Sequence, residues 1–377
     1  MTETPRVLLF GSVPMPHGGI QQHTIRLLDY LQHHGYEARL ADVLHWRAGQ
    51  AVVQAPGIAP CGNSVFAIAK QIHDFQPNLI HSHVYRWRIT SALGLLSHLT
   101  ARDASPIRTM LTIHGESFFT ILPAPVRPMV YAALRRVDHV IADNDNLLNF
   151  LHERVGVSPD HSSIQGAFLP PRADELDPAT LPADLRAFMA DHAPLLASNG
   201  AVATFAGEDK YGIDLILRAT ARLRETFPRI GVVFCVTALS EPDRMDKLRA
   251  LAAELGVQDC IRFVANLPSL LPVVAAADAT IRATNTDGDA LSVHESLMLG
   301  TPALASDVVT RPALCDKFRN RDADDLAEVA LRVLRRGRHG PEVTQRVHHA
   351  GPELLGIYDR LLGHGPGSAA QGQPTRG

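Results

Sequence analysis

Residues 281–300 read IRATNTDGDALSVHESLMLG, and this stretch indicates the architecture of the chain more clearly than any other. The apolar run that ends at Ile281 predicts a buried strand, and residues 284–290 form a polar loop. A short helix is expected to begin at Leu291 or Ser292 and to end at Gly300. A strand, a glycine-containing loop and a helix N-terminus in this order present unpaired backbone N–H groups, and therefore predict a phosphate site.

Two carboxylates flank this predicted phosphate site, Asp287 in the loop and Glu295 in the helix. Carboxylates can accept hydrogen bonds from sugar hydroxyls, so the stretch suits a nucleotide-sugar. The same residues also allow a purely structural interpretation, because Ser292 and Glu295 fit an S-x-x-E capping box and residues 287–289 are ordinary turn chemistry. The position of the stretch within the chain favours the binding site.

Strand and helix patterns alternate twice along the chain, which predicts an α/β protein with two doubly wound, Rossmann-like domains. A Pro- and Asp-rich segment between the two series reads as a linker that contains one short helix, and the Gly-rich C-terminal end reads as a disordered tail. The expected parts are a first domain over 1–168, a linker over 169–200, a second domain over 201–345, a final helix over 346–362 and a disordered tail over 363–377.

Composition excludes several classes of protein. The chain has 377 residues, of which 46% are hydrophobic, enough for two cores. A charged fraction of 20% and a net charge of −3 indicate neither a nucleic-acid binder nor a disordered chain. Four scattered cysteines without a C-x-x-C pair favour a reducing compartment. Without a signal-peptide pattern or a spanning apolar stretch, the expected location is the cytoplasm, with peripheral contact on the inner face of the membrane left open.

Five short signals occur in the order found in one known family. They are Pro16-His-Gly-Gly19 after the first strand, Thr112-Ile-His-Gly115, the segment 136–143 (RVDHVIAD), Phe205-Ala-Gly207 with Tyr211-Gly-Ile-Asp-Leu215, and the acidic pair Asp287 and Glu295. With them the chain resembles the retaining glycosyltransferases of family 4 over roughly residues 5–362. The resemblance implies the GT-B fold, in which two Rossmann-like domains, an N-terminal acceptor domain and a C-terminal donor domain, face each other across a cleft.

The resemblance also implies roles for particular residues. Gly18 and Gly19 would let the backbone approach the donor phosphate, and His114 would lie beside the transferred sugar. Asp287 would bind sugar hydroxyls, and Glu295 would bind the ribose hydroxyls. The expected backbone donors to the diphosphate or sugar are Gly288, Asp289, Ala290 and Leu291. On this view Asp287→Ala abolishes transfer and leaves the fold intact.

One departure from the family concerns the charge at the diphosphate. The family has an Arg and a Lys where this chain has Glu208 and Tyr211, so the usual cationic clamp is missing. Lys210 and Arg282 are the two candidates to replace it. A helix N-terminus together with one of these cations can stabilise the leaving group, so we expect no metal and no other cofactor. The family mechanism also needs no covalent enzyme nucleophile.

Other catalytic motifs are absent from the sequence, and some residues allow two interpretations. The sequence has no P-loop, no G-x-S-x-G and no complete H-E-x-x-H. His81 and His83 alternate on a strand, so only one is expected to face the cleft, and both are more typical of core or surface positions than of ligands. The Arg and aromatic residues at 85–88, and the Arg residues at 126–136, fit either a membrane-docking face or a solvated helix face.

These observations predict a retaining glycosyltransferase of the hexosyltransferase type. It would move a sugar from a UDP- or GDP-type donor to a hydroxyl of a glycan or lipid-linked acceptor, in cell-surface glycan, polysaccharide or glycolipid assembly. Two alternatives stay open, a nucleotide-sugar epimerase on the same fold and a non-catalytic nucleotide-sugar-binding protein. The residues do not indicate the base, the sugar, the acceptor, the linkage or the oligomeric state.

Overall fold

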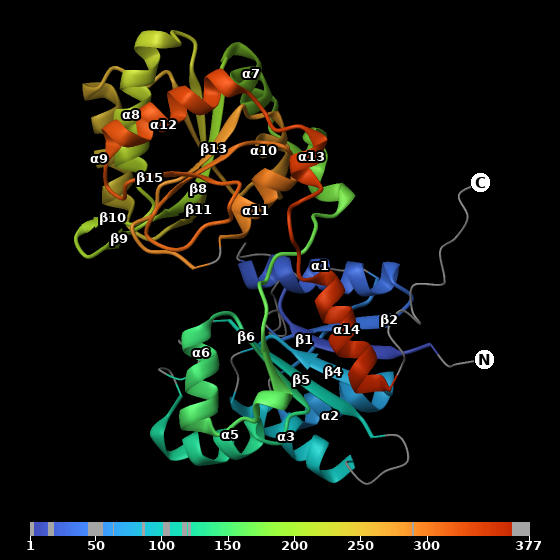
Figure 1. Cartoon of the computed structure of the whole chain (residues 1–377). Helices are drawn as coiled ribbons and strands as arrows, with labels where there is room; N and C mark the ends of the chain where they lie inside the picture. The colour runs from blue at the N-terminus through green and yellow to red at the C-terminus, as the bar shows by residue number, and fades with distance from the viewer. Residues whose placement is uncertain are drawn as a thin grey trace, which may run out of the picture. The chain divides into compact units, whose positions relative to one another are not determined.

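The chain folds into two compact α/β units (Figure 1). Unit 1 comprises Met1–Leu169 and His349–Gly377, and unit 2 comprises Pro170–His348. The computed structural model describes residues 4–13, 19–43, 56–62, 64–84, 87–100, 106–114, 119, 122–288 and 290–363. No helix within these residues is long and apolar enough to cross a membrane.

Unit 1 is built on a parallel sheet with the strand order β3-β2-β1-β4-β5-β6-β7 across the described residues. The strands are β1 (Arg6–Gly11), β2 (Glu37–Asp42), β3 (Ile58–Pro60), β4 (Leu79–Ser82), β5 (Arg108–Ile113), β6 (His139–Ala142) and β7 (Ser162–Ile164). The main helices are α1 (Gly19–His33), α2 (Val65–Phe75), α3 (Trp87–Thr100), α5 (Arg127–Leu134), α6 (Asp145–Phe150) and α14 (Gly351–Leu362).

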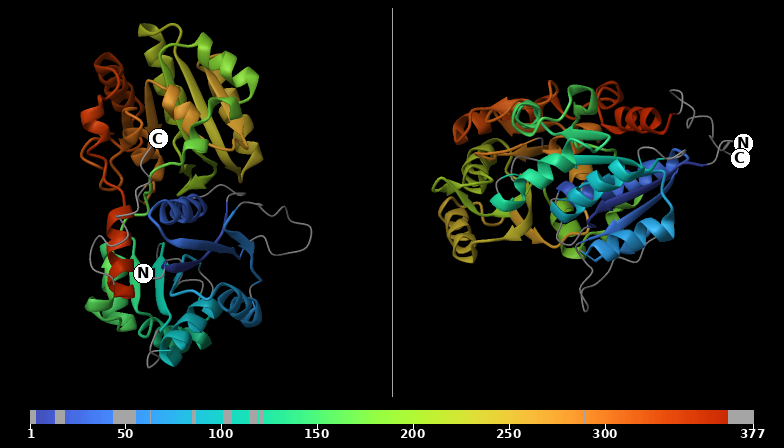
Figure 2. Two further views of the ribbon diagram at one scale, coloured as in Figure 1. Left: turned by 90° about the vertical axis from the view of Figure 1, so that its right-hand side faces the viewer. Right: turned by 90° about the horizontal axis from the view of Figure 1, so that it is seen from below.

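Both faces of this sheet are buried under helices, as the apolar run of β1 requires (Figure 2). Val7 and Leu9 of β1 pack on one side with α1 and α14, and Leu8 and Phe10 pack on the other side with α2, α3 and α5. The last helix thus returns the chain to unit 1, where Tyr358 is fully buried.

Unit 2 repeats this design, with the strand order β12-β11-β8-β13-β14-β15 in its described residues. Its strands are β8 (Leu195–Val202), β11 (Gly231–Leu239), β12 (Ile261–Ala265), β13 (Ala279–Arg282), β14 (Ala303–Ser306) and β15 (Asp316–Phe318), and β9 (Thr204–Phe205) pairs with β10 (Glu208–Asp209) in a small antiparallel hairpin. Its helices are α7 (Ala183–Asp191), α8 (Ile213–Thr226), α9 (Pro242–Glu254), α10 (Leu271–Ala276), α11 (Leu291–Met298), α12 (Ala323–Arg336) and α13 (Pro341–Thr344). The expected pair of doubly wound domains is confirmed.

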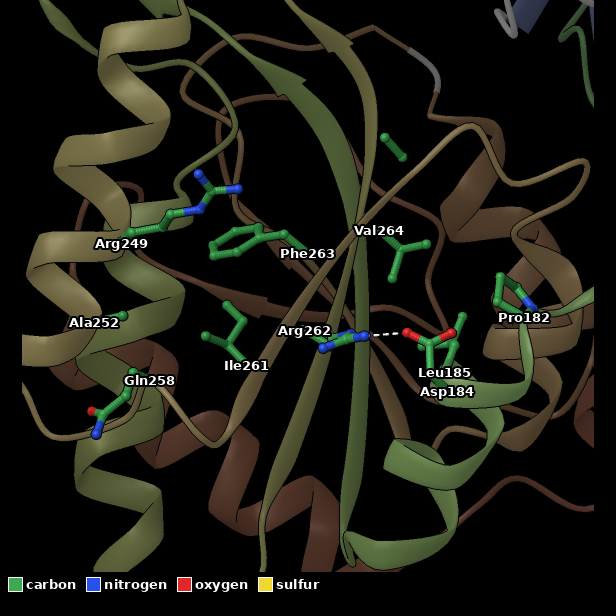
Figure 3. Close-up of a pocket in the computed structure, with 11 residues that line it drawn as sticks. Pro182, Asp184, Leu185, Arg249, Ala252, Gln258, Ile261, Arg262, Phe263 and Val264 are labelled. Atoms are coloured by element: carbon green, nitrogen blue, oxygen red, sulfur yellow. Dashed lines mark hydrogen bonds and ion pairs between the residues drawn. The ribbon is translucent and has the colours of Figure 1, made fainter.

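The segment 169–200 is not a linker, and this expectation was wrong. It contains α7 and most of β8, which lies between β11 and β13 in the sheet of unit 2. Leu185 of α7 is buried and lines a hollow of about 390 Å³ beside β12, and the Asp184 carboxylate forms an ion pair with Arg262 there (Figure 3). The sequence pattern hid β8 because Ser198, Asn199 and Gly200 interrupt its apolar run.

Other boundaries differ by a few residues. The final helix begins at Gly351 instead of residue 346, and the expected disordered tail lies, apart from Gly363, outside the described residues.

Each sheet reverses its direction of strand addition once. In unit 1 the reversal lies between β1 and β4, and in unit 2 between β8 and β13. Ligands of open α/β sheets bind outside the carboxyl ends of the strands at such a switch point. The loops that follow these four strands are therefore the places to look for a site.

Candidate functional site

In unit 2 the loops that follow β8 and β13 lie against each other. The Asn285 N–H donates to the Lys210 carbonyl oxygen at 3.0 Å, and the Asn285 side-chain amide donates to the Phe205 carbonyl oxygen at 3.3 Å. Gly212 makes this contact possible, because a Cβ there would lie 2.2 Å from the Ala283 carbonyl oxygen and its φ is +64°. The segment 205–215, which holds the fourth family signal, thus packs against the loop that leads to Asp287 of the fifth signal.

Asp287 is held by two guanidinium groups. Its Oδ1 accepts from Arg282 Nη2 at 2.8 Å, and its Oδ2 accepts from Arg282 Nε at 3.1 Å and from Arg311 Nη1 at 2.8 Å. These three bonds leave about one of the roughly four lone-pair positions of the carboxylate for a sugar hydroxyl. The side chains of Asp287 and Arg311 are only 6% and 2% exposed. Loss of Asp287 would leave the buried Arg311 guanidinium without this partner, so we predict that Asp287→Ala destabilises unit 2, in contrast to the expectation from the sequence.

The two arginines also determine the charge state of Asp287. Burial by itself raises the pKa of this carboxyl group, but the hydrogen bonds and charges of Arg282 and Arg311 outweigh burial and lower the pKa below its ordinary value. Asp287 is therefore ionised at neutral pH.

Arg311 was missed by the sequence reasoning. It lies in the loop after β14, where its Nε donates to the Ser306 carbonyl oxygen at 3.0 Å, and the Ser306 hydroxyl donates to the Thr284 carbonyl oxygen at 2.6 Å. The loops after β13 and β14 are thereby joined around Asp287. A single arginine in a polar segment carries no signal that could have identified it.

Helix α11 begins at Leu291, as expected, and this start does not fit the capping box of the purely structural interpretation. Its N-cap is Ala290, which makes no side-chain cap hydrogen bond, so Ser292 and Glu295 lie inside the helix and do not occupy the N-cap and N3 positions of an S-x-x-E box. Glu295 is nevertheless 7% exposed. A hydrogen bond of 2.7 Å between the hydroxyls of Thr280 and Ser296 holds α11 against β13. The N-cap side chain therefore does not satisfy the backbone donors at the start of α11, and the buried acid Glu295 lies one turn behind them.

The two candidate cations differ in their surroundings. Arg282 is committed to Asp287, whereas the Lys210 ammonium forms no ion pair with any residue that the structure describes. Both lie beside the Tyr211 ring, with Lys210 Nζ at 5.6 Å and Arg282 Cζ at 5.2 Å from its centroid. Glu208, which stands where the family has Arg, forms an ion pair with Arg321 at 3.3 Å. Lys210 is the better candidate to meet a diphosphate.

In unit 1 the predicted residue His114 belongs to a cluster of three histidines, the histidine cluster, with His23 and His83. One potential ligand atom of each ring lies within 4.8 Å of those of the others. His83 follows β4, His114 follows β5, and His23 lies in α1, so the cluster is at the carboxyl ends of the strands next to the switch point. The sequence reasoning did not single out His23, because a histidine in an amphipathic helix gives no signal of its own.

Of His81 and His83, only His83 belongs to the histidine cluster, although the two rings lie on the same side of the strand. Residues two apart on a strand share a face, and their ring centroids are 4.0 Å apart. His81 is a core residue, since its Nδ1 lies 2.6 Å from the Tyr358 hydroxyl and its Nε2 lies 2.7 Å from the Thr112 hydroxyl.

Burial keeps the three imidazole rings of the histidine cluster neutral. It lowers the pKa of His23 to about 4 and that of His114 to about 3, and it also lowers the pKa of His83. His114 therefore acts at neutral pH as a neutral hydrogen-bonding group.

The remaining predicted site residues have simple outcomes. Gly288 is exposed in the loop before α11, and Gly19 is the first residue of α1. Gly18 and Asp289 lie outside the described residues.

Two family models match the chain. Residues 17–164 match Glycosyltransferase Family 4, and residues 200–336 match Glycosyl transferases group 1. Together they cover about three quarters of the sequence. Each match falls largely within one of the two units.

Curated relatives match over shorter segments. A D-inositol 3-phosphate glycosyltransferase of Acidothermus cellulolyticus is 32% identical over 122 residues, which are 30% of this chain and 27% of that protein. The Thermomonospora curvata protein of the same name is 33% identical over 169 residues, which are 40% of this chain and 38% of that protein. The matched segments thus span less than half of the length of either relative.

Solved structures match over nearly the whole chain. A glycosyltransferase from Rickettsia africae has a TM-score of 0.65 at 14% identity, covering 95% of this chain and 99% of its own. Sucrose-phosphate synthase from Thermosynechococcus elongatus has a TM-score of 0.65 at 16% identity and the same coverage. At such low identity these structures show the fold alone. The fold of both units and the two consecutive family matches agree, and the chain belongs to the family 4 glycosyltransferases of the GT-B fold.

Proposed function

We propose that this chain transfers a sugar from a nucleoside diphosphate sugar to a hydroxyl acceptor with retention of configuration. The observation that carries the proposal is the arrangement at the switch point of unit 2. There the buried acid Glu295, the start of α11 at Ala290 and Lys210, which has no ion pair among the described residues, accompany Asp287, whose carboxylate is oriented by two arginines. Glu295 can bind the ribose hydroxyls. The start of α11 and Lys210 can bind the diphosphate, and Asp287 can bind a hydroxyl of the sugar.

The diphosphate is bound by positive charge and backbone donors. Lys210 neutralises one phosphate, and the N–H groups from Gly288 to Leu291 donate to the other at the positive end of α11. Glu295 accepts from the ribose hydroxyls, and the free lone-pair position of Asp287 accepts from a hydroxyl of the transferred sugar. HepE of Anabaena was crystallised with UDP-glucose; it has a TM-score of 0.57 to this chain at 13% identity, covering 95% of both chains, and supports this donor class.

The chemistry follows from charge placement. The acceptor hydroxyl attacks the face from which the diphosphate departs, a phosphate oxygen takes the proton, and no covalent bond to the enzyme forms. Negative charge that develops on the leaving group is stabilised by Lys210 and the α11 dipole, so transfer needs no metal. His114, neutral at pH 7, positions a hydroxyl of the transferred sugar. One oriented donor of this kind typically contributes about 3 kcal/mol to transition-state stabilisation.

A groove in unit 1 suits a lipid-linked acceptor. It has a volume of about 590 Å³ between α3 and α5, and its lining combines apolar side chains with arginines. Leu95 and Met129 are 57% and 45% exposed, and Arg88 and Arg136 stand at the same groove. The apolar chain of a lipid can lie on Leu95 and Met129. Its phosphate, or an anionic membrane surface, can then contact Arg88 and Arg136. This supports the membrane-docking interpretation of residues 85–88 and 126–136 for the part of them that the structure describes.

The experiment is thermal unfolding of the full chain with nucleoside diphosphates and their sugars in the presence of a chelator. A ligand at 100 times its Kd adds about 2.7 kcal/mol to the unfolding free energy. At roughly 2–4 °C per kcal/mol for a unit of this size, the transition of unit 2 should rise by about 5–11 °C. Glu295→Gln should lose the shift, and Glu328→Gln, an exposed acid on α12, should keep it.

Product analysis then separates the three functions that the sequence left open. A glycoside with the anomeric configuration of the donor supports the proposal. An isomerised nucleotide-sugar would indicate an epimerase, and binding without turnover of any acceptor tested would indicate a non-catalytic protein. Absence of a shift with every nucleotide would contradict the donor site itself.

A further inference from the structure

The histidine cluster of unit 1 has the composition and spacing of a metal site. His23 and His83 are 3% and 1% exposed, and the potential ligand atoms of His23, His83 and His114 lie within 4.8 Å of one another. His83 Nδ1 and His114 Nε2 are hydrogen-bonded at 3.2 Å, so one of them carries a proton that a bound metal would replace. Two nitrogens bound at 2.0–2.1 Å to one tetrahedral zinc ion are about 3.3 Å apart, so this pair is already spaced as ligands are.

The hydrogen bonds of His23 prepare its ring for a metal. Its Nδ1 lies 2.6 Å from the Ala167 carbonyl oxygen, and since a carbonyl oxygen only accepts, this nitrogen carries the proton. Nε2 of His23 therefore holds a lone pair. Histidines that bind metals have this tautomer, with the second nitrogen donating to a backbone carbonyl or carboxylate. His81, the neighbouring ring, is excluded as a ligand because Tyr358 and Thr112 engage both of its nitrogens.

His83 can also adopt the required tautomer. Its Nε2 is buried and has no hydrogen-bond partner among the described residues. If Nδ1 of His83 turns its lone pair to a metal, the ring proton moves to Nε2, and no proton has to leave the protein.

We propose that His23, His83 and His114 bind one divalent transition-metal ion of the zinc type, and that this ion inhibits sugar transfer. Three imidazoles select zinc over magnesium or calcium, which prefer oxygen ligands. The second part of the proposal rests on the proposed function, in which His114 positions the transferred sugar. An ion on His114 and a sugar hydroxyl on His114 exclude each other. Transfer thus needs no metal and is blocked by this one.

Metal binding is measured without turnover, on the full chain purified with a chelator. Equilibrium dialysis should give one zinc ion per chain. Cobalt(II) should give the intense visible absorption of a tetrahedral site, and zinc should abolish it. His23→Gln and His83→Gln keep a polar side chain of similar size and should each weaken zinc binding by more than about 100-fold. Loss of an outer-shell partner typically costs roughly 10–100-fold, and loss of a ligand should cost more. His33→Gln on the same helix, at a side chain that is 72% exposed, is the matched control and should bind as the wild type does.

Three outcomes decide the proposal. Stoichiometric binding that is lost in both cluster variants and retained in the control supports the site. Absence of stoichiometric binding, or binding that both variants retain, overturns it. Binding without a decrease in transfer rate overturns the inhibition. If the chain shows no transfer with any donor, the proposed function fails, and the dialysis and cobalt measurements still decide the metal site.

Discussion

Replacement of Asp287 by alanine tests whether the two arginines in unit 2 depend on this carboxylate. Asp287 binds Arg282 through two nitrogens and Arg311 through one, at 2.8–3.1 Å. The side chains of the three residues are 6%, 16% and 2% exposed, so solvent screens these ion pairs only weakly. Without Asp287, the guanidinium of Arg311 remains buried next to Ser306 with no other counter-ion among the described residues.

The expected cost follows from this stranded charge. Removal of one partner of a buried ion pair typically costs about 3–5 kcal/mol, mainly because the other charge stays buried. For a unit of this size, about 2–4 °C per kcal/mol converts this cost into a fall of roughly 6–20 °C in the Tm of unit 2. The contribution of Asp287 is present above the unfolded-state pKa of about 3.9 and is lost as the pH falls through its lowered folded-state pKa. The difference from the wild type should therefore be complete at pH 6.

Differential scanning calorimetry of both transitions measures this effect. The matched control is Asp246→Ala, because Asp246 pairs with Arg249 at 3.4 Å on the surface, where its side chain is 78% exposed, and its loss should cost less than about 1 kcal/mol. The double variant Asp287→Ala/Arg311→Met removes the stranded charge and should recover at least half of the lost stability. A single variant that melts within 2 °C of the control, or a double variant less stable than the single one, would refute the reasoning.

Three further expectations concern other parts of the structure. The pKa of His23 is near 6.5 in the unfolded chain and about 4 in the folded chain. As the pH falls from 6.5 to 4, calorimetry should therefore show that the unfolding free energy of unit 1 decreases by up to about 3 kcal/mol, and by less in His23→Gln. Lys210→Ala should weaken nucleoside diphosphate binding about 10–100-fold by isothermal titration, while Lys247→Ala on α9 leaves the affinity unchanged. Gly212→Ala should destabilise unit 2 by more than about 1 kcal/mol in urea unfolding, because its Cβ would meet the Ala283 carbonyl oxygen; an unchanged midpoint would contradict that contact.

The architecture could be predicted from sequence because it depends on patterns that are local. Apolar runs such as RVLLFG at Arg6–Gly11 have to be covered on both faces, and their alternation with amphipathic helices leaves a doubly wound sheet as the consistent solution. The polar loop over 284–290 and the start of the next helix at Leu291 were found for the same reason, although the helix ends at Met298 and not at Gly300. The failure over 169–200 has a local cause as well, since β8 combines a buried position with the polar residues Ser198 and Asn199.

The residues around the predicted site required the tertiary structure. Arg311 meets Asp287 from the loop after a different strand, 24 positions away. His23, His83 and His114 come from a helix and two strand ends, which only the strand order of the sheet brings together. The sequence by itself determined that two parallel α/β units exist and where an acid-flanked helix N-terminus lies, because main-chain hydrogen bonding and burial repeat along the chain. Which side chains neutralise, orient or surround those acids was decided by tertiary structure, because the carboxyl ends of parallel strands gather loops that are distant in sequence.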